Sequence, residues 1–282
     1  MLFHEQLRGE LRKLFARPRT WMGYGAFLVM EAVILLVYKL PGSQKLMKGV
    51  LERNGLDFGT YYSSLTITFT IMLGSMFILG SIYFALVAGD IVAKENEDGN
   101  LRMVFARPIS RLRLLIVKYT AVSLYTFSFV FFVGASGYAM AVAAVGWEGG
   151  LFVMEPKMKV FAAYPDWLEG AGRLALSATG IGLSMITLSS IGFTFSCFKI
   201  KPAAATIVTL SILFIDFILQ GFPFFKPYES YFITWRMSAW VFLLEQTISW
   251  PKIIESYAFL LGLNITLFIL GWLSFQTRDF KT

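Results

Sequence analysis

Residues 89–118 read GDIVAKENEDGNLRMVFARPISRLRLLIVK and form the longest charged segment between two strongly apolar ones. The stretch holds six basic and four acidic residues, a charge density that the hydrocarbon core of a membrane excludes. Gly99-Asn100 predicts a turn or the end of a helix, and Arg107-Pro108 a second break. Ser110 predicts the N-cap of a helix that continues into the next apolar segment. We therefore expect two short helices and a turn that face the cytoplasm.

The overall composition is that of a membrane protein. Of the 282 residues, 56% are hydrophobic and only 15% are charged, which is far from the average of soluble domains. Membrane topology and anionic lipid explain the net charge of +7, so we expect no nucleic-acid partner. The chain has one cysteine, Cys197, and one histidine, His4. They exclude an intrachain disulfide and a Cys/His metal site within one chain, and they leave little room for histidine catalysis.

Six apolar segments predict six transmembrane helices. Each is close to or longer than the roughly 20 residues that cross about 30 Å of hydrocarbon, and core helices of a soluble protein would not be so long and so uniform. We expect the whole chain, residues 1–282, to form one all-α transmembrane domain. The predicted spans are residues 21–37, 66–88, 119–145, 174–198, 203–221 and 257–275.

Two further segments are predicted to lie at the membrane surfaces. Residues 1–20 carry apolar side chains at helical spacing with basic residues on the other side, which predicts an amphipathic interfacial helix. Residues 222–256 are rich in aromatic residues, too polar to span and too apolar for a free loop, so we predict a re-entrant element there. Residues 38–65 and 146–173 mix Gly, Pro, charged and aromatic residues, as expected of outer caps. The apolar residues of the N-terminal helix are Phe3, Leu7, Leu11 and Leu14.

The distribution of basic residues predicts the orientation of the chain. If the N-terminus is cytoplasmic, the inner segments hold 15 of the 25 Lys and Arg residues and have a net charge of +8, whereas the outer loops have a net charge of +1. Basic residues are enriched in cytoplasmic loops. We therefore expect a multi-pass protein of the cell membrane, the inner membrane where there are two, with both termini in the cytoplasm.

The charged stretch resembles the first cytoplasmic loop of the permease subunits of the type-2 ATP-binding-cassette (ABC) exporter family. The shared order is an acidic pair, Gly, a polar residue, Leu, several apolar residues, Pro, Ser-Arg and Lys. The chain departs from the family pattern at Asn100, where Thr is usual, and at Met103 and Phe105, where the family run is rich in Leu. The matching positions are Glu95, Glu97, Gly99, Leu101, Pro108, Ser110, Arg111 and Lys118.

The resemblance implies an exporter permease that pairs with a second permease chain, identical or related, and binds two separate ATPase subunits. It places a coupling helix in residues 89–118, where the ATPase would dock. The sequence lacks the P-loop pattern GxxxxGK[ST], so ATP-driven work must come from a partner. We expect no enzyme activity and no cofactor in this chain, with ATP and Mg²⁺ bound by the ATPase. The implied coupling residues are Glu95, Glu97, Gly99, Asn100, Leu101, Arg102, Arg107 and Pro108.

Glu31 and Asp216 are the only Asp, Glu, Lys or Arg residues inside the predicted spans. Intramembrane carboxylates are costly, so each either belongs to a translocation path or has a structural or interfacial role. They define the alternative function, a secondary transporter or channel that needs no ATPase. A membrane scaffold without transport is the second alternative. Small residues at Ser81, Ala85 and Gly89 lie four apart and predict close helix packing, either within the chain or at a dimer seam.

Overall fold

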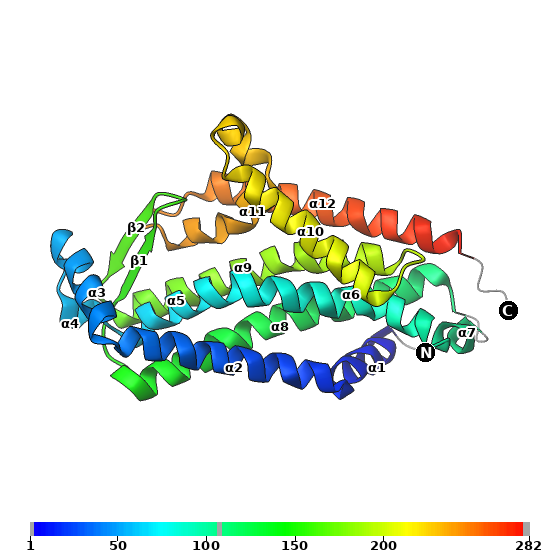
Figure 1. Cartoon of the computed structure of the whole chain (residues 1–282), viewed down its shortest axis with the longest axis horizontal. Helices are drawn as coiled ribbons and strands as arrows, with labels where there is room; N and C mark the ends of the chain where they lie inside the picture. The colour runs from blue at the N-terminus through cyan, green and yellow to red at the C-terminus, as the bar shows by residue number, and fades with distance from the viewer. Residues whose placement is uncertain (1–2, 106–108, 279–282) are drawn as a thin grey trace.

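Six long apolar helical segments run lengthwise through the computed structural model, which describes residues 3–105 and 109–278 (Figure 1). By length and composition, each of them can cross a membrane. They confirm the predicted all-α class and the six predicted spans. Their bounds are α2 (Pro18–Lys39), the continuous run of α5 (Ser64–Ser75), η1 (Met76–Gly80) and α6 (Ser81–Glu97), α8 (Arg111–Val145), α9 (Trp167–Ser196), α10 (Pro202–Gln220) and α12 (Trp250–Gln276).

Several helices extend well beyond the predicted spans. The second continues to Glu97 and the third begins at Arg111, so most of the loop predicted at residues 89–118 is helical. At 1.5 Å per residue, the 35 residues of α8 measure about 52 Å, longer than the roughly 30 Å of hydrocarbon. Hydropathy marks only the part of a helix that contacts lipid, and it misses helix ends that ion pairs stabilise outside the membrane.

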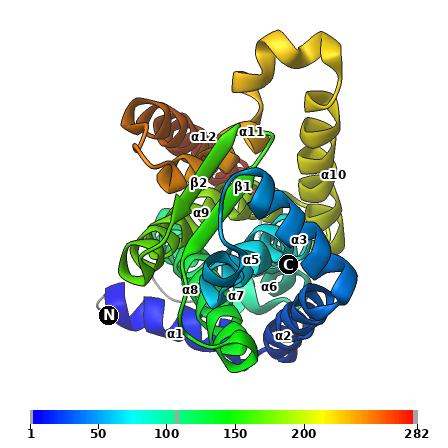
Figure 2. The same cartoon turned by 90° about the vertical axis from the view of Figure 1, so that its left-hand side faces the viewer.

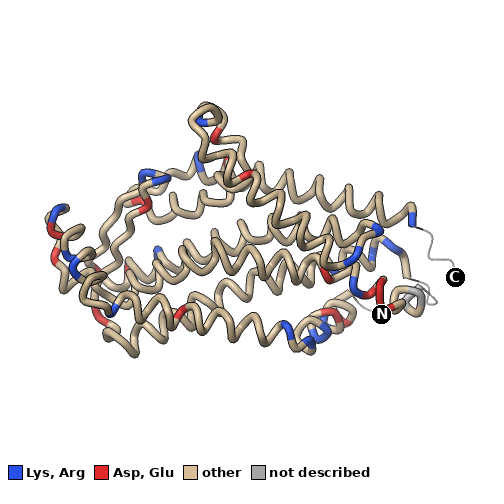
Figure 3. The backbone as a smooth tube through the Cα atoms, viewed as in Figure 1, with Lys and Arg blue, Asp and Glu red and all other residues tan. Residues whose placement is uncertain are grey.

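Charged residues gather at the two ends of the molecule and on the projecting segment between α10 and α12, and they are sparse along the rest of the bundle (Figure 3). At one end, helix α1 (Phe3–Ala16) lies beside the short helix α7 (Asn100–Phe105), and α12 ends there too (Figure 1). Helix α1 is amphipathic as predicted, and Leu7, Leu11 and Leu14 pack against the hydrophobic core. We refer to this end as the inner end and to the opposite one as the outer end.

Helix α9 and the second span form the centre of the bundle. In their most apolar windows, 72% and 61% of the residues are buried, compared with 22% in α2, α10 and α12. Small residues allow the close approach of these helices: a Cβ atom on Gly192 of α9 would lie 3.0 Å from the Cβ of Ala88, and one on Gly89 would lie 2.8 Å from Oγ1 of Thr206 on α10. The small residues at Ala88 and Gly89 therefore serve packing within the chain.

A π-helix, η1, interrupts the second span between α5 and α6. The two halves have different neighbours: α5 packs mainly against α8, whereas α6 packs mainly against α9 and α10. π-Helical turns inside α-helices are rare and occur often at functional sites. The interruption thus lies where the second span passes from one set of neighbours to the other.

The outer end carries a cap that includes a β-hairpin which the sequence analysis did not predict (Figure 2). Helices α3 (Pro41–Arg53) and α4 (Phe58–Tyr61) precede the second span, and strands β1 (Leu151–Glu155) and β2 (Val160–Tyr164) pair antiparallel, with Leu151 opposite Tyr164. Ser63 donates a hydrogen bond to the carbonyl of Gly150 (2.5 Å), and the amide of Phe152 donates to Oγ1 of Thr66 (2.9 Å). The hairpin is thereby joined to the start of α5.

The segment predicted as a re-entrant element consists of short helices. These are the 3-10 helix η2 (Pro223–Tyr231), α11 (Ile233–Met237) and the 3-10 helix η3 (Ser238–Leu244). Six residues of η3, from Ala239 to Leu244, are buried, and η3 packs against α9. The predicted loop included residues 250–256, but these residues are the first part of α12. Entry of the segment into the outer leaflet stays a prediction.

The close approach of α9 and α6 predicts the effect of a larger side chain at Gly192. Gly192→Leu should lower the stability of the solubilised protein by about 1–3 kcal/mol, because overpacking forces the two helices apart. The control is Gly262→Leu on α12, where no atom lies within 4 Å of the added Cβ. Thermal unfolding of both variants in the same detergent would measure the difference. Equal melting temperatures would contradict the central packing of α6 against α9.

Candidate functional site

The predicted coupling region is a turn between α6 and the short helix α7. Helix α6 ends at Glu97, the amide of Asp98 donates to the carbonyl of Lys94 (2.9 Å), and Gly99 has a φ of +72°. This left-handed conformation is costly for residues with a Cβ atom, so glycine permits the reversal into α7. The turn predicted at Gly99-Asn100 is confirmed. So is the predicted N-cap of α8, because Ser110 Oγ accepts from the amide of Arg113 (3.3 Å).

The structure divides the predicted coupling residues into two groups. Glu97 and Asn100 are exposed, whereas Leu101 is 1% exposed and belongs to the hydrophobic core. Leu101 therefore anchors α7 to the bundle, and Met103, which is 68% exposed, is an apolar side chain that α7 presents. Glu95 is buried as well. Arg107, Pro108 and the side chain of Arg102 lie outside the described part of the chain.

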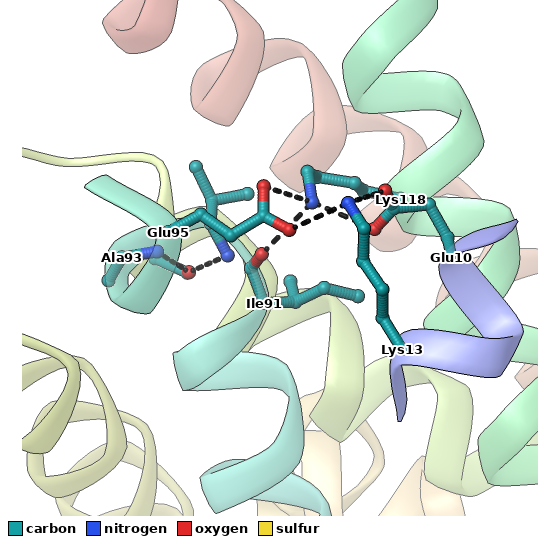
Figure 4. A network of polar contacts seen from close by, with 8 residues as sticks. Glu10, Lys13, Ile91, Ala93, Glu95 and Lys118 are labelled. Carbon is teal, nitrogen blue, oxygen red and sulfur yellow. Dashed lines mark hydrogen bonds and ion pairs between the residues drawn. The ribbon is translucent and has the colours of Figure 1, made fainter. Parts of the chain in front are cut away.

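Glu95 belongs to a buried network of four charged groups that connects α1, α6 and α8 (Figure 4). The ammonium of Lys118, whose side chain is fully buried, lies 2.8 Å from Oε2 of Glu10 and 2.7 Å from Oε2 of Glu95. Lys13 lies 2.7 Å from Oε1 of Glu10 and 3.2 Å from Oε1 of Glu95. Two carboxylates and two ammonium groups thus alternate, and their formal charges cancel.

The network shifts the pKa values of its two members on α1. Burial alone would raise the pKa of Glu10, but the charges and hydrogen bonds of Lys118 and Lys13 bring it below its ordinary value. Burial alone would lower the pKa of Lys13, but Glu10 and Glu95 raise it. Both shifts favour the charged forms. The ion pair of Glu10 with Lys13 is therefore intact at neutral pH, and it is lost only as the pH falls through the depressed pKa of Glu10.

Further contacts fix the inner half of α6. Asp90 forms an ion pair with Arg19 at the start of α2. The amides of Val92 and Ala93 donate to Oγ of Ser196 at the end of α9, at 2.9 and 2.8 Å. At the start of α8, Arg111 donates to the carbonyl of Gln276 at the end of α12 (2.6 Å). These contacts join the inner half of α6 to α2 and α9, and the start of α8 to the end of α12.

Sequence reasoning did not identify Glu10, Lys13 or Lys118 as members of a site. A signal was present in α1, because Glu10 lies on the helix face that carries Leu7 and Leu14, where an amphipathic helix normally places apolar residues. Which basic residue would meet Glu10 could not be read from the sequence. Lys118 follows it by 108 residues, and only the packing of α1 on α8 brings the two together.

The two intramembrane carboxylates do not meet in one polar site. Glu31 of α2 is fully buried against α8, where Ser136 Oγ donates to its Oε1 (2.9 Å). Asp216 of α10 accepts from the amides of Ile233 and Thr234 (3.0 and 2.8 Å) and from the hydroxyl of Thr234 (2.6 Å). Asp216 therefore caps α11 and joins it to α10. The capping contacts of Asp216 favour a structural role, whereas Glu31 accepts a hydrogen bond only through Oε1, and its Oε2 is buried without a hydrogen-bond partner among the described residues.

Lys118→Met would leave two buried carboxylates sharing the half-exposed Lys13. We expect a loss of about 3–5 kcal/mol of stability, the usual effect of removing one partner of a buried ion pair. Lys94→Met is the matched control: Lys94 pairs with Glu97 and Asp98 at the surface, where the loss should stay below about 1 kcal/mol. Thermal unfolding of the two variants would compare their losses of stability. Adding Glu95→Gln to Lys118→Met should recover part of the loss, and no recovery would speak against direct pairing.

Asp216→Ala should destabilise the protein by roughly 1–2 kcal/mol, since the amides at the start of α11 lose their acceptor. Asp216→Asn keeps one of the two acceptor oxygens, so it should lose less stability than Asp216→Ala and should retain transport. The measurements are thermal unfolding and transport by the reconstituted complex. Transport lost in Asp216→Asn at unchanged stability would show that the charge of Asp216 acts in the transport cycle and would contradict the capping role.

Comparison with known proteins gives one family match. The family model described as ABC-2 family transporter protein matches residues 6–216. The matched region begins in α1 and ends within α10, so it contains the buried network, the turn at Gly99, four of the six long helical segments and most of α10. No curated protein matches the sequence.

Proposed function

Since the chain belongs to the ABC-2 transporter family and is the membrane permease of an ABC transporter, we propose that two permease chains pair and bind two separate ATPase subunits. The partner chain is a second copy or a related permease. ATP and Mg²⁺ are bound by the ATPase, and substrate is exported. The protein lies in the cell membrane, and its inner end and both termini face the cytoplasm, as the excess of basic residues there favours.

The position of α7 carries this proposal. The helix lies at the inner end of the bundle, beyond the long helices, and it is joined through Gly99 to the central helix α6 (Figure 1). Its exposed Met103 is available to a partner, while its buried Leu101 anchors it to the core. An ATPase that moves α7 therefore also acts on α6, and α6 contacts α9 and α10.

The buried network supports transmission of that movement. Glu95 lies two residues before the end of α6, and its pairing with Lys118 and Lys13 ties α6 to α8 and α1. A push on α7 is therefore passed to three helices that move together at their inner ends. The π-helix η1 gives the second span a point at which this inner half can change its angle to α5. In physical terms, coupling needs such an element with two arrangements that the partner can bias.

The contacts of the intramembrane carboxylates do not favour the alternative of a secondary transporter. All three hydrogen bonds to Asp216 come from the segment that it caps. Glu31 is enclosed between helices and hydrogen-bonded to Ser136.

The first test is purification of the tagged protein in mild detergent from its native host. We expect a stoichiometric ATP-binding subunit that hydrolyses ATP in the complex. Its reproducible absence would contradict the proposal and favour the alternatives.

Gly99→Pro tests the coupling turn. Proline holds φ near −65°, which is incompatible with the φ of +72° at Gly99, so α7 should be displaced. We expect retention of the ATPase subunit, or its stimulated hydrolysis, to fall at least about tenfold. Gly55→Pro is the matched control: Gly55 has a φ of +70° in the outer cap, and, like Gly99, no atom lies within 4 Å of an added Cβ.

The control variant Gly55→Pro should therefore have a comparable local strain but retain the ATPase subunit. Equal retention and equal hydrolysis in both proline variants would refute the coupling role of the turn. Leu101→Asp is unsuitable for this purpose, because Leu101 lies in the core and its replacement by a carboxylate would destabilise the fold.

A further inference from the structure

A groove of about 490 Å³ lies on the side of the bundle, between α8, α9 and α12. Its walls are mostly apolar, and Ile116, Leu183 and Ile265 among them are exposed at the surface. Because all three helices are long and apolar enough to cross a membrane, this surface faces lipid. The volume is within the range of sites that enclose a small molecule. The groove is therefore open to molecules that are dissolved in the bilayer.

The polar side chain of Asn264 lies in this groove near the middle of a span. Asn264 is 14 residues from the first residue of α12 and 12 from the last, or roughly 20 Å from either end. Its Oδ1 is buried and has no hydrogen-bond partner among the residues that the structure describes. An unpaired polar atom is costly in hydrocarbon. An occupant that hydrogen-bonds to the amide would remove this cost.

Two other polar groups of the groove already have partners on α9. The hydroxyl of Tyr119 on α8 lies 2.8 Å from Oγ of Ser190, and the hydroxyl of Tyr257 on α12 donates to the carbonyl of Gly180 (2.8 Å). These bonds hold the walls of the groove together. The amide of Asn264 therefore remains for an occupant.

The unpaired amide specifies the chemistry of the occupant. An amide has an acceptor oxygen and a donor nitrogen, and a hydroxyl group can donate to the first and accept from the second. The hydrocarbon chains of lipids can do neither. A second copy of the chain in a symmetric contact centred here would place groove against groove, and two concave surfaces do not fill each other. A small apolar molecule with a hydroxyl group satisfies both the walls and the amide.

We infer that this groove binds a small apolar molecule with one hydroxyl group, which enters from the lipid and hydrogen-bonds to the amide of Asn264. The occupant contacts α8, α9 and α12 together, and α9 is a central helix of the bundle. The inference goes beyond the proposed function, because binding at this groove needs no ATPase.

Photolabelling with two matched probes tests the site. 4-(Hydroxymethyl)benzophenone and 4-ethylbenzophenone are similar in size, but only the first has a hydroxyl group. The purified permease in lipid nanodiscs is irradiated with each, and labelled peptides are identified by mass spectrometry. The hydroxymethyl probe should label the groove walls at least about fivefold more than the ethyl probe, the discrimination expected from one buried hydrogen bond. Equal labelling, or labelling spread evenly over all lipid-facing helices, would overturn the inference.

Asn264→Leu removes the amide at similar volume. Labelling of the groove by the hydroxymethyl probe should fall to the level of the ethyl probe, and unchanged labelling by the ethyl probe shows that the variant is folded. Thr266→Val is the matched control on the same helix: it removes an exposed hydroxyl that donates to the carbonyl of Gly262, so the preference should persist. A preference that persists in Asn264→Leu would refute the inference.

Filling the groove gives an independent readout. Leu183→Trp should reduce labelling of the walls by both probes, whereas Leu176→Trp, two turns away on α9 and also exposed, should not. Equal labelling of these two variants would contradict binding in the groove. A second permease chain that covers the groove would block both probes in the unmodified protein and would overturn the inference too. Retention of the ATPase, which tests the proposed function, is a separate measurement, so either can fail without the other.

Discussion

The pairing of Lys118 with Glu10 and Glu95 is the interaction on which the inner end of this protein depends. Lys118 is fully buried, and its ammonium is compensated by two carboxylates from different helices. A buried charge without a partner is costly, so α1, α6 and α8 have few arrangements in which all four charges are satisfied. The network thus specifies where α1 lies on the bundle.

This constraint connects two parts of the molecule that differ in their surroundings. On the side of the network that faces the outer end, the long helices are held by apolar packing and by close approaches at small residues such as Gly192 and Gly89. On the side that faces the inner end, α7 is held by the core residue Leu101 and by the turn at Gly99. A partner at the inner end therefore acts on α6, which is firmly attached to its neighbours at that end. The second span, to which α6 belongs, is interrupted further along by the π-helix η1.

The outer end is organised by hydrogen bonds and by an ion pair between α11 and α12. Asp216 caps α11, and Ser63 and Thr66 connect the β-hairpin to α5. Arg236 donates to Glu255 (2.8 Å) and so joins α11 to the start of α12. The cap links α5, α10, α11 and α12, which gives the outer end its own set of connections, separate from the network at the inner end.

The sequence by itself determined the class of the protein, its six spans, the amphipathic α1 and the turn at Gly99, because hydropathy, helical periodicity and glycine act over a few neighbouring residues. It did not determine where the helices end, the β-hairpin, or the roles of Glu95 and Leu101 in the coupling region. Those features depend on partners far away in the chain: Glu95 pairs with Lys118 and Lys13, and Leu101 is buried by packing against other helices. Only the tertiary structure decided which charged residues face a partner and which hold the bundle together, because the cost of burying a charge depends on the groups that surround it.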